Sequence, residues 1–338
     1  MKQYRVGLVG VGAVGAEMIS VLRERKFPCD KVQVFASRER DEVIAGETFH
    51  ILPATEDCFK GLDIVLFAGG TDASIKFRPA VVAAGAVMID NSRAFRQEEG
   101  VPLVVPQVNA EDLEWHKGVI ANPNCTTAIM LEAVAPLHRA KKVKRIIAST
   151  YQAASGAGAK GMAELELQMK QLAAGEEPTV AAFQHQLTYN LIPHIDKFDE
   201  TNWYTLEELK MLNESRKMLH APDLLLSCTS VRVPIPRAHS ESLNLEFEEE
   251  ITPEEARELL NAAEGVKVVD DPLNNVYPMP MDATAKYDVL AGRIRQDISR
   301  RDKKGLDMFV SGDQLLRGAA LNAVEIAEEL VKRDLVRK

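Results

Sequence analysis

Cys125 is the residue of this chain best placed for covalent chemistry. It lies in the polar segment Asn122 to Thr127, and a run of helical character, Ala128 to His138, follows directly. The N-terminus of a helix carries partial positive charge, which favours the thiolate, the nucleophilic form of cysteine. We therefore predict that Cys125 attacks a carbonyl carbon and carries an acyl group. A buried, inert cysteine is the commoner role for this residue type, so the surrounding elements have to decide between the two.

A glycine-rich turn near the start of the chain predicts a nucleotide site. The apolar run Val6 to Val9 is typical of a buried strand, and a helical pattern passes through Met18 and Leu22. Between them, residues 10–15 have the spacing GxGxxG. Such glycines permit a tight turn and let a pyrophosphate approach the helix N-terminus. Because a strand and a helix flank the motif, we expect a dinucleotide to bind here.

The segment after the second predicted strand favours NADP over NAD. That strand, Lys31 to Phe35, is followed by Ser37 and Arg38, without the acidic residue that usually binds the 2′-hydroxyl of NAD. A hydroxyl and an arginine suit a 2′-phosphate instead. An ordinary charged loop is the alternative, since Glu39 is the next residue.

Strand and helix patterns alternate in the first part of the chain. The apolar runs Leu62 to Phe67 and Ala86 to Ile89 are typical of strands, and Ala73 to Ala84 between them is helical. This alternation predicts a doubly wound parallel sheet. The turn Gly69-Gly70-Thr71 comes after a parallel strand, on the ligand-binding edge of such a sheet.

The later part of the chain has a different pattern. Its apolar runs predict a mixed, largely antiparallel sheet with helices on one face, interrupted by an irregular stretch from Pro178 to Trp203. The expected strands are residues 144–152, 224–233, 243–249, 288–296 and 306–311. The expected helices are residues 162–172, 206–219, 253–263 and 314–331.

A cysteine nucleophile needs an acid or base and a group that holds its substrate. Arg232 lies on a predicted strand, and its planar guanidinium suits a carboxylate. His239 follows at the corner before the next strand, but other histidines are equally visible in the sequence: His185, His194 and His220. Beside a nicotinamide, a thioester on the cysteine would accept hydride and leave as an aldehyde.

The composition describes an ordinary globular protein. Its 338 residues are enough for two domains, and 46% hydrophobic residues allow a large core. A net charge of −9 argues against nucleic acid or an anionic membrane surface as a partner. Four scattered cysteines, without CxxC or cysteine–histidine spacing, argue against a metal site and favour a reducing, cytoplasmic location. The sequence shows neither a signal peptide nor a membrane-spanning apolar run.

Five separate motifs resemble those of the aspartate-semialdehyde dehydrogenase family, in the same order and over nearly the whole chain. The matching segments are residues 121–127, 151–156, 190–196, 231–240 and 312–320. The resemblance implies an oxidoreductase that converts L-aspartyl-4-phosphate and NADPH into L-aspartate 4-semialdehyde, phosphate and NADP. This reaction belongs to the biosynthesis of lysine (through diaminopimelate), threonine, methionine and isoleucine.

The resemblance also implies a role for individual residues. Cys125 corresponds to the acyl-carrying nucleophile and His239 to the acid/base group. Gln152 and Arg232 would hold the amino-acid end of the substrate, and Glu207 its ammonium. The phosphate-binding residues would be Arg96, Asn124 and Lys210. The cofactor site would be lined by Gly10, Gly12, Ala13, Val14, Gly15, Ser37, Arg38, Gly69, Gly70, Thr71, Ser155, Gly156, Pro193 and Gln314.

The same resemblance predicts the organisation of the chain. A Rossmann-type NADP-binding domain would comprise residues 1–125 and 320–338, closed by the final helix. An α+β catalytic and dimerisation domain would comprise residues 126–319, and the protein would form a homodimer or homotetramer. Three features depart from the family: the first glycine turn often reads GATGAVG and differs here at Val11 and Gly12, residues 38–41 carry two acids where Arg-Ser is common, and Arg93 replaces a small residue.

Two other functions remain open on the sequence. One is reduction of a related acyl phosphate, N-acetylglutamyl phosphate; the set Gln152, Glu207 and Arg232 favours a free amino-acid end instead. The other is a non-catalytic paralogue that acts as a binding or assembly protein. Such a chain would be expected to lose Cys125 or His239, and both are present.

Overall fold

The computed structural model describes residues 2–29 and 31–336, and the chain divides into two compact units. Unit 1 comprises Met1–Asn124 and Ala319–Lys338, and unit 2 comprises Cys125–Gly318. Unit 2 is thus inserted into the sequence of unit 1. The domain boundaries expected from the sequence differ from these by a single residue at each junction.

The described part of unit 1 contains a seven-stranded sheet in the order β3-β4-β2-β1-β5-β6-β7. All neighbouring strands are parallel except the hairpin formed by β3 and β4, which confirms the doubly wound sheet. The strands are β1 (Val6–Val9), β2 (Val32–Ala36), β3 (Arg40–Ile44), β4 (Glu47–Pro53), β5 (Ile64–Phe67), β6 (Val87–Asp90) and β7 (Val119–Ala121). The four-residue strands β1, β5 and β6 are buried along their whole length, as strands covered on both faces are.

The charged segment after β2, for which an ordinary loop was the alternative, forms a hairpin. Charged residues occupy the start of β3, which lies at the edge of the sheet and has only one neighbour. An edge strand tolerates charged side chains because one side of it meets solvent. Arg40 pairs with Glu42 at 2.8 Å, and His50 of β4 pairs with Asp41 at 2.7 Å. The charge run that resembles a loop is therefore an edge hairpin.

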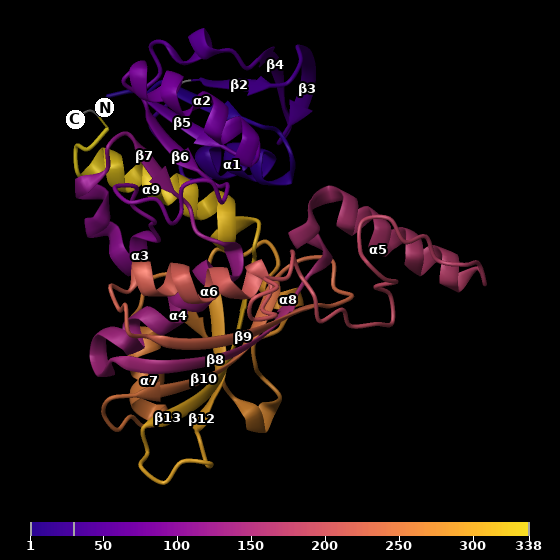
Figure 1. The fold of residues 1–338 in the computed structure, drawn as a ribbon, viewed down its shortest axis with the longest axis vertical. Coiled ribbons are helices and arrows are strands. Elements are labelled where there is room, and N and C mark those ends of the chain that lie inside the picture. Colours follow the sequence, from indigo (N-terminus) through magenta and orange to yellow (C-terminus); the bar gives the residue numbers. More distant parts are fainter. Residues whose placement is uncertain (1, 30, 337–338) are drawn as a thin grey trace. The chain divides into compact units, whose positions relative to one another are not determined.

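Helices cover the sheet of unit 1, and the last of them comes from the end of the chain. α9 packs on α1, α3 and β6, and its side chains are largely buried (Figure 1). The helices are α1 (Ala13–Glu24), α2 (Thr71–Ala83), α3 (Pro106–Asn109) and α9 (Leu321–Lys332), with short turns η1 (Glu56–Phe59) and η2 (Ala110–Trp115). The helix expected over 314–331 is confirmed over most of its length, but its beginning differs. A π-turn, η5 (Leu316–Ala320), precedes α9, and the N–H of Gly318 bonds five residues back to the carbonyl of Asp313.

The described part of unit 2 contains a six-stranded mixed sheet in the order β11-β12-β13-β10-β8-β9. The three inner pairings are antiparallel and the two outer ones parallel, which confirms the predicted mixed sheet. The strands are β8 (Val143–Gln152), β9 (Leu225–Arg232), β10 (His239–Phe247), β11 (Val266–Val268), β12 (Val289–Gln296) and β13 (Gly305–Gly312).

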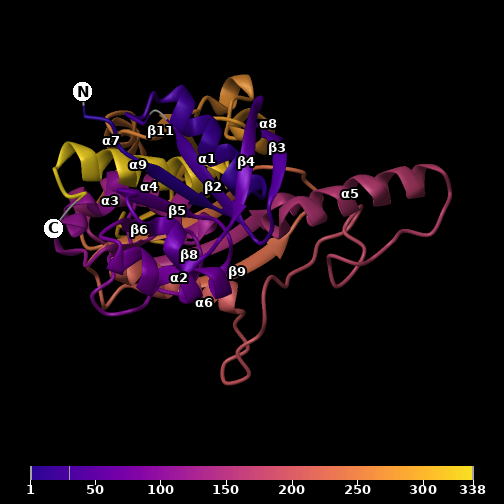
Figure 2. The ribbon, with the colours of Figure 1, turned by 90° about the horizontal axis from the view of Figure 1, so that it is seen from above.

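One face of this second sheet is covered by α4, α6 and α7 (Figure 1). The helices of unit 2 are α4 (Cys125–Lys141), α5 (Gly158–Ala173), α6 (Leu206–Met218), α7 (Pro253–Asn261) and α8 (Pro280–Ala283), with turns η3 (Ala154–Ala157) and η4 (Pro272–Asn274). α5 and the irregular segment after it extend away from the sheet in both views (Figure 2).

Candidate active site

The register of the second sheet places three predicted site residues in one row. Gln152 ends β8 and pairs with Arg232, which ends β9. Ser240 pairs with Tyr151, so the preceding residue, His239, lies beside Gln152. The sequence had indicated that His239 lies at a corner before the strand. In the structure it is the first residue of β10. All three side chains are buried, with exposed fractions of 1%, 6% and 0% for Gln152, Arg232 and His239.

Cys125 is the first residue of α4, where the partial positive charge of the helix is concentrated. Burial lowers the pKa of Arg232, while the charges of Glu207 and Cys125 act in the opposite direction. The cysteine therefore lies within electrostatic reach of the guanidinium. Gly318 is packed against it, because a Cβ at position 318 would be 2.6 Å from the Cβ of Cys125. Any side chain there would displace the predicted nucleophile.

A chain of polar contacts runs from the end of β8 to α6. Thr150 Oγ1 donates to Gln152 Oε1 at 3.0 Å, and Gln152 Nε2 donates to Glu207 Oε1 at 3.0 Å. Lys210 Nζ then donates to Glu207 Oε2 at 2.9 Å and to Asp196 Oδ2 at 2.7 Å. The sequence reasoning missed Thr150 and Asp196; only alternation along the strand could have placed Thr150 on this face.

The start of α6 is held firmly, which fixes the first turn that carries Glu207. Thr205 Oγ1 accepts from the N–H of Glu208, and the Glu208 carboxylate accepts from the N–H of Thr205. This reciprocal capping box satisfies two N–H groups of the helix start. The same carboxylate accepts from the N–H of Ser230 on β9 at 2.9 Å, so α6 is tied to the strand that carries Arg232.

A backbone contact fixes the tautomer of His239. The N–H of Ala153 donates to His239 Nδ1 at 3.1 Å, and a backbone N–H acts only as a donor. Nδ1 therefore carries no proton, and the neutral ring holds its proton on Nε2. Burial lowers the pKa of His239 to about 3, and the charge of Arg232 acts in the same direction, so the ring is neutral near pH 7. Nε2 has no hydrogen-bond partner within the described part of the chain and is available as a donor.

The glycine turn after β8 lies directly against Arg232 and His239. A Cβ at Gly156 would be 2.5 Å from Arg232 Nη1 and 3.2 Å from His239 Nε2. The same Nη1 donates to the carbonyl of Ala153 at 2.6 Å. Only glycine therefore leaves space for a ligand next to both groups.

Three further predicted cofactor residues come together near this row. Gln314 Nε2 donates to Ser155 Oγ, and Gln314 Oε1 accepts from the N–H of Ala238 at 2.9 Å. Pro193 follows Ile192, whose backbone forms an antiparallel bridge with Arg232. These residues thus lie at the same end of the sheet as Gln152, although they are far apart in sequence.

Unit 1 contains a cavity of about 610 Å³ at the carboxyl ends of β1, β2 and β5. Four of the predicted cofactor residues line it: Gly10, Gly12, Ser37 and Gly69. The other lining residues, which the sequence reasoning did not select, are Val9, Ala36, Ala54, Ala68, Asp72, Ala73, Lys76 and Phe77. The other predicted cofactor residues of unit 1 do not line this cavity. Ala13, Val14 and Gly15 begin α1, and Gly70 and Thr71 lie at the start of α2. Arg38 is exposed and does not line the cavity either.

The three glycines of the first turn have different surroundings, and these fit a bound dinucleotide. Gly10 has φ of +96°, and a Cβ there would be 2.7 Å from the backbone of Ala68. A Cβ at Gly15 would be 2.1 Å from the carbonyl oxygen of Gly10, so this glycine allows helix and strand to pack closely. A Cβ at Gly12 would have no atom within 4 Å and would take space in the cavity itself. These are the requirements of a tight turn, close packing and close approach by a pyrophosphate.

The predicted phosphate-binding residues are divided between the units. Arg96 and Asn124 belong to unit 1 and are buried, and Lys210 belongs to unit 2. Arg96 Nε donates to the carbonyl of Asn122 at 2.9 Å, and Nη2 donates to the carbonyl of Asn91 at 3.0 Å. Arg96 is therefore held against the segment that leads to Cys125.

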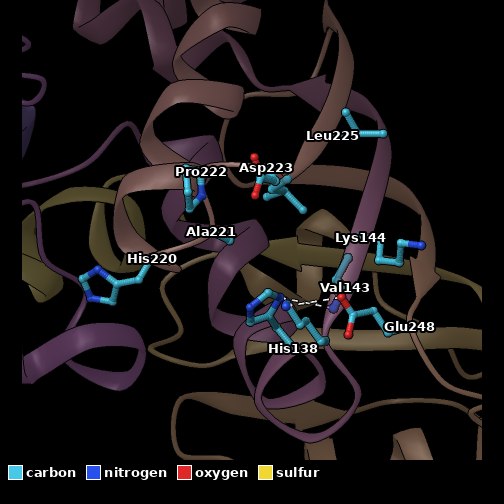
Figure 3. Close-up of a pocket in the computed structure, with 11 residues that line it drawn as sticks. His138, Val143, Lys144, His220, Ala221, Pro222, Asp223, Leu225 and Glu248 are labelled. Atoms are coloured by element: carbon cyan, nitrogen blue, oxygen red, sulfur yellow. Dashed lines mark hydrogen bonds and ion pairs between the residues drawn. The ribbon is translucent and has the colours of Figure 1, made fainter.

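A separate pocket in unit 2 is not formed by the predicted site residues. It has a volume of about 290 Å³ and lies at the C-terminal end of α4, whereas Cys125 begins this helix. Figure 3 shows the side chains that line it, among them His138, His220 and Glu248. None of the residues in the buried row contributes to this pocket, so we do not assign the chemistry to it.

The described residues form neither a metal-binding group nor a membrane-spanning helix. Among residues 2–29 and 31–336, no group of three or more His, Cys, Asp or Glu side chains is arranged to hold a metal ion. Over the same residues, no helix is long and apolar enough to cross a membrane.

Comparison with known proteins identifies both units. Residues 5–116 match the family described as the semialdehyde dehydrogenase NAD-binding domain, and residues 134–317 match the semialdehyde dehydrogenase dimerisation domain. The aspartate-semialdehyde dehydrogenase of Aquifex aeolicus is 47% identical, over 98% of this chain and 99% of its own length. That of Bacillus subtilis is 43% identical, over 98% of each chain.

Solved structures agree with these matches. Aspartate semialdehyde dehydrogenase II of Vibrio cholerae, complexed with ASA, has a TM-score of 0.94 and 37% identity. The match covers 98% of this chain and 99% of that one. Together, the matching domains, the full-length relatives and this structure show that the chain belongs to the aspartate-semialdehyde dehydrogenase family.

Proposed function

We propose that this chain reduces L-aspartyl-4-phosphate with NADPH to L-aspartate 4-semialdehyde and phosphate, through an acyl group on Cys125. The arrangement of Cys125 at the start of α4, within electrostatic reach of Arg232, carries this proposal. The relatives supply the substrate class: they are named aspartate-semialdehyde dehydrogenases, and the Vibrio cholerae structure is complexed with ASA. The alternatives of an N-acetylglutamyl phosphate reductase and a non-catalytic paralogue are not favoured by these relatives.

In the first half of the reaction, the thiolate of Cys125 attacks the acyl carbon of the substrate. A C–S bond forms, the bond from carbon to the phosphate oxygen breaks, and phosphate leaves. Arg232 binds the substrate carboxylate through its planar guanidinium, and Glu207 binds the α-ammonium. His239 donates its Nε2 proton as a hydrogen bond to the carbonyl oxygen, on which negative charge develops.

In the second half, the thioester is reduced. NADPH, when bound, would supply a hydride for the thioester carbon, and Gly10, Gly12 and Ser37 line the cavity of unit 1 that would hold it. The C–S bond then breaks, the aldehyde leaves, and Cys125 returns as a thiolate beside the helix N-terminus. No proton has to reach the oxygen atom in either half, so a neutral donor at His239 is sufficient for both.

NADP selectivity, oligomeric state and location are also proposals. Strand β2 ends without an acidic residue, and Ser37 and Lys76 line the cavity with a hydroxyl and a cation that suit a 2′-phosphate. Arg38 is next to Ser37 in the chain, though outside the lining set. We further propose a homodimer, or a homotetramer built from it, formed through unit 2, and a cytoplasmic location consistent with four free cysteines.

The test is phosphate-dependent reduction of NADP by L-aspartate 4-semialdehyde, run in the reverse direction. Cys125→Ala is expected to abolish turnover and to leave NADP affinity within about twofold, because Cys125 does not line the cavity of unit 1. Wild-type protein without phosphate-dependent activity, or a Cys125→Ser variant as active as wild type, would contradict the proposal. Loss of both turnover and NADP binding in Cys125→Ala would mean that this residue is structural.

A matched control is available in unit 1. Cys58 lies in the turn η1 and does not line the cavity of unit 1, so Cys58→Ala is expected to retain full turnover. Burial raises the pKa of its thiol, which disfavours the thiolate. Alkylation at neutral pH should modify Cys125 faster than Cys58, because only the former begins a long helix. Equal rates at the two cysteines would count against an activated nucleophile.

A further inference from the structure

Lys210 is shared between two carboxylates, and only one of them belongs to the predicted site. Its ammonium lies 2.9 Å from Glu207 Oε2 and 2.7 Å from Asp196 Oδ2. The three side chains are largely buried, with exposed fractions of 19% for Lys210, 8% for Glu207 and 21% for Asp196. Both carboxylates thus hold the ammonium that is predicted to bind phosphate. While it donates to both, fewer of its N–H groups are available to a phosphate.

Both oxygens of Glu207 are already used in the structure. Oε1 accepts from Gln152 and Oε2 accepts from Lys210. A substrate ammonium that binds Glu207 therefore competes with Lys210 for Oε2. Its arrival releases Lys210 from one of its two partners.

We propose that Asp196 is the positioning residue that keeps Lys210 in the site during this exchange of ion-pair partners. When the substrate ammonium takes Oε2 of Glu207, Asp196 remains as the anchor of Lys210, which then presents its free N–H groups to phosphate. Phosphate binding thereby depends on prior occupation of Glu207 by an ammonium. This inference rests on the proposed function, since it assumes that the site binds both an amino acid and phosphate.

The geometry of Asp196 suits an anchor. Its other carboxylate oxygen, Oδ1, accepts from the N–H of Lys197 at 2.9 Å, so the side chain is held from two directions. Its backbone has φ of +69°, a conformation that few residues other than glycine, asparagine and aspartate adopt readily. The segment is also fixed at both ends: Ile192 bridges Arg232, and the carbonyl of Lys197 accepts from the N–H of Leu206 at the start of α6.

The test is Asp196→Asn, measured in the reverse reaction with phosphate varied. Asparagine tolerates the same backbone conformation and can keep the bond to Lys197, so the fold is preserved. We expect the KM for phosphate to rise about tenfold, while the KM for NADP and kcat at saturating phosphate stay within about twofold. Asp196→Glu, which keeps a carboxylate within reach of the flexible lysine, should recover part of the phosphate affinity. Asp199→Asn, in the same irregular segment but bonded to Thr201 and Asn202 rather than to Lys210, should behave like wild type.

The partner exchange has its own test with wild-type protein. Succinate semialdehyde has the same aldehyde and carboxylate as the natural substrate but no ammonium, so Lys210 should stay bound to Glu207. The KM for phosphate is expected to be several-fold higher with this aldehyde than with L-aspartate 4-semialdehyde. An equal phosphate KM for the two aldehydes would overturn the exchange, and an unchanged or lower KM in Asp196→Asn would overturn the anchor. Both KM comparisons can be made only if the wild-type protein is active. Failure of the proposed function would instead appear as the absence of wild-type turnover.

Discussion

The protonation of a single ring determines what His239 can do. With Nδ1 accepting from the N–H of Ala153 and a pKa lowered to about 3 by burial, the ring carries one proton, on Nε2, throughout the neutral range. We therefore predict that nitrogen NMR will find Nε2 protonated and Nδ1 unprotonated, without titration between about pH 5 and pH 9. His50 is an internal reference, because bonding to Asp41 raises its pKa. Its signals should titrate, with a pKa above the usual histidine value.

Variants at His239 test the donor role by activity. His239→Gln keeps an N–H donor, whereas His239→Leu removes it and should cost about 10²- to 10³-fold in kcat. We expect the glutamine variant to retain clearly more activity than the leucine variant. Two results together would contradict the donor role: titration of His239 near pH 6.5 by NMR, and equal losses of kcat in the glutamine and leucine variants. They would show that His239 acts instead as a general acid and base.

At the scale of elements, strand register forms a second row on the same face of the sheet, two residues along each strand from Gln152, Arg232 and His239. Ser230, Thr150, Glu241 and Val310 are neighbours across β9, β8, β10 and β13. Glu241 is fully buried, and neither of its carboxylate oxygens has a hydrogen-bond partner within the described residues. Burial raises its pKa well above the usual value, so the folded protein holds this carboxyl as a neutral acid.

This row makes the stability of the protein depend on pH. Above about pH 4.5 an unfolded chain releases the Glu241 proton while the folded chain keeps it, so the free energy of unfolding falls as pH rises. The slope is about 1.4 kcal/mol per pH unit until the folded-state pKa is reached. Glu241→Gln removes this titration and should be more stable than wild type near pH 9, with the difference shrinking toward pH 5. Denaturant unfolding at several pH values measures it.

A control residue lies on the opposite face of the same strand. Glu246 is partly exposed and pairs with Arg145 at 2.7 Å and Arg300 at 2.9 Å. Glu246→Gln should lose a little stability or none, and should gain none at high pH. Parallel pH curves for Glu241→Gln and wild type would show that Glu241 is ionised in the folded state.

The sequence was informative where a local pattern determines a local structure. Residues 10–15 predicted their turn because spacing, strand and helix lie within one short segment, and most strands of the two sheets follow from their apolar runs. The strands β3, β4 and β11 were not predicted. The edge hairpin at Arg40 was missed because alternating charges on an edge strand resemble a loop. Asp196 and Thr150 were missed because their importance depends on which side chains face them across α6 and β8, and register across distant strands is not encoded by spacing. Family resemblance, rather than local pattern, selected His239 among the histidines.

At the scale of the whole molecule, the chain crosses between the units at two adjacent points. Gly318, the last residue of unit 2, packs against Cys125, the first, since a Cβ at 318 would be 2.6 Å from the Cβ of Cys125. The residues bonded to them, Asn124 and Ala319, are therefore neighbours as well. Unit 1 needs both of its pieces, because α9 fills its core with side chains that are fully buried: Leu321, Val324, Ile326 and Leu330.

This arrangement predicts that unit 1 can fold without unit 2. Joining Asn124 to Ala319 with two or three glycines spans the short gap at little entropic cost and keeps the α9 contacts, including Arg25 with Glu328 at 2.6 Å. We expect this joined protein to unfold cooperatively and to bind NADP, measured by calorimetry, with no turnover because Cys125 is absent. Residues 1–124 alone should fail to fold, since their apolar surface against α9 would be exposed. Two results would contradict this prediction: cooperative folding of residues 1–124 alone, or a joined protein that stays unfolded. Either would show that Asn124 and Ala319 do not mark the boundary of an independent folding unit.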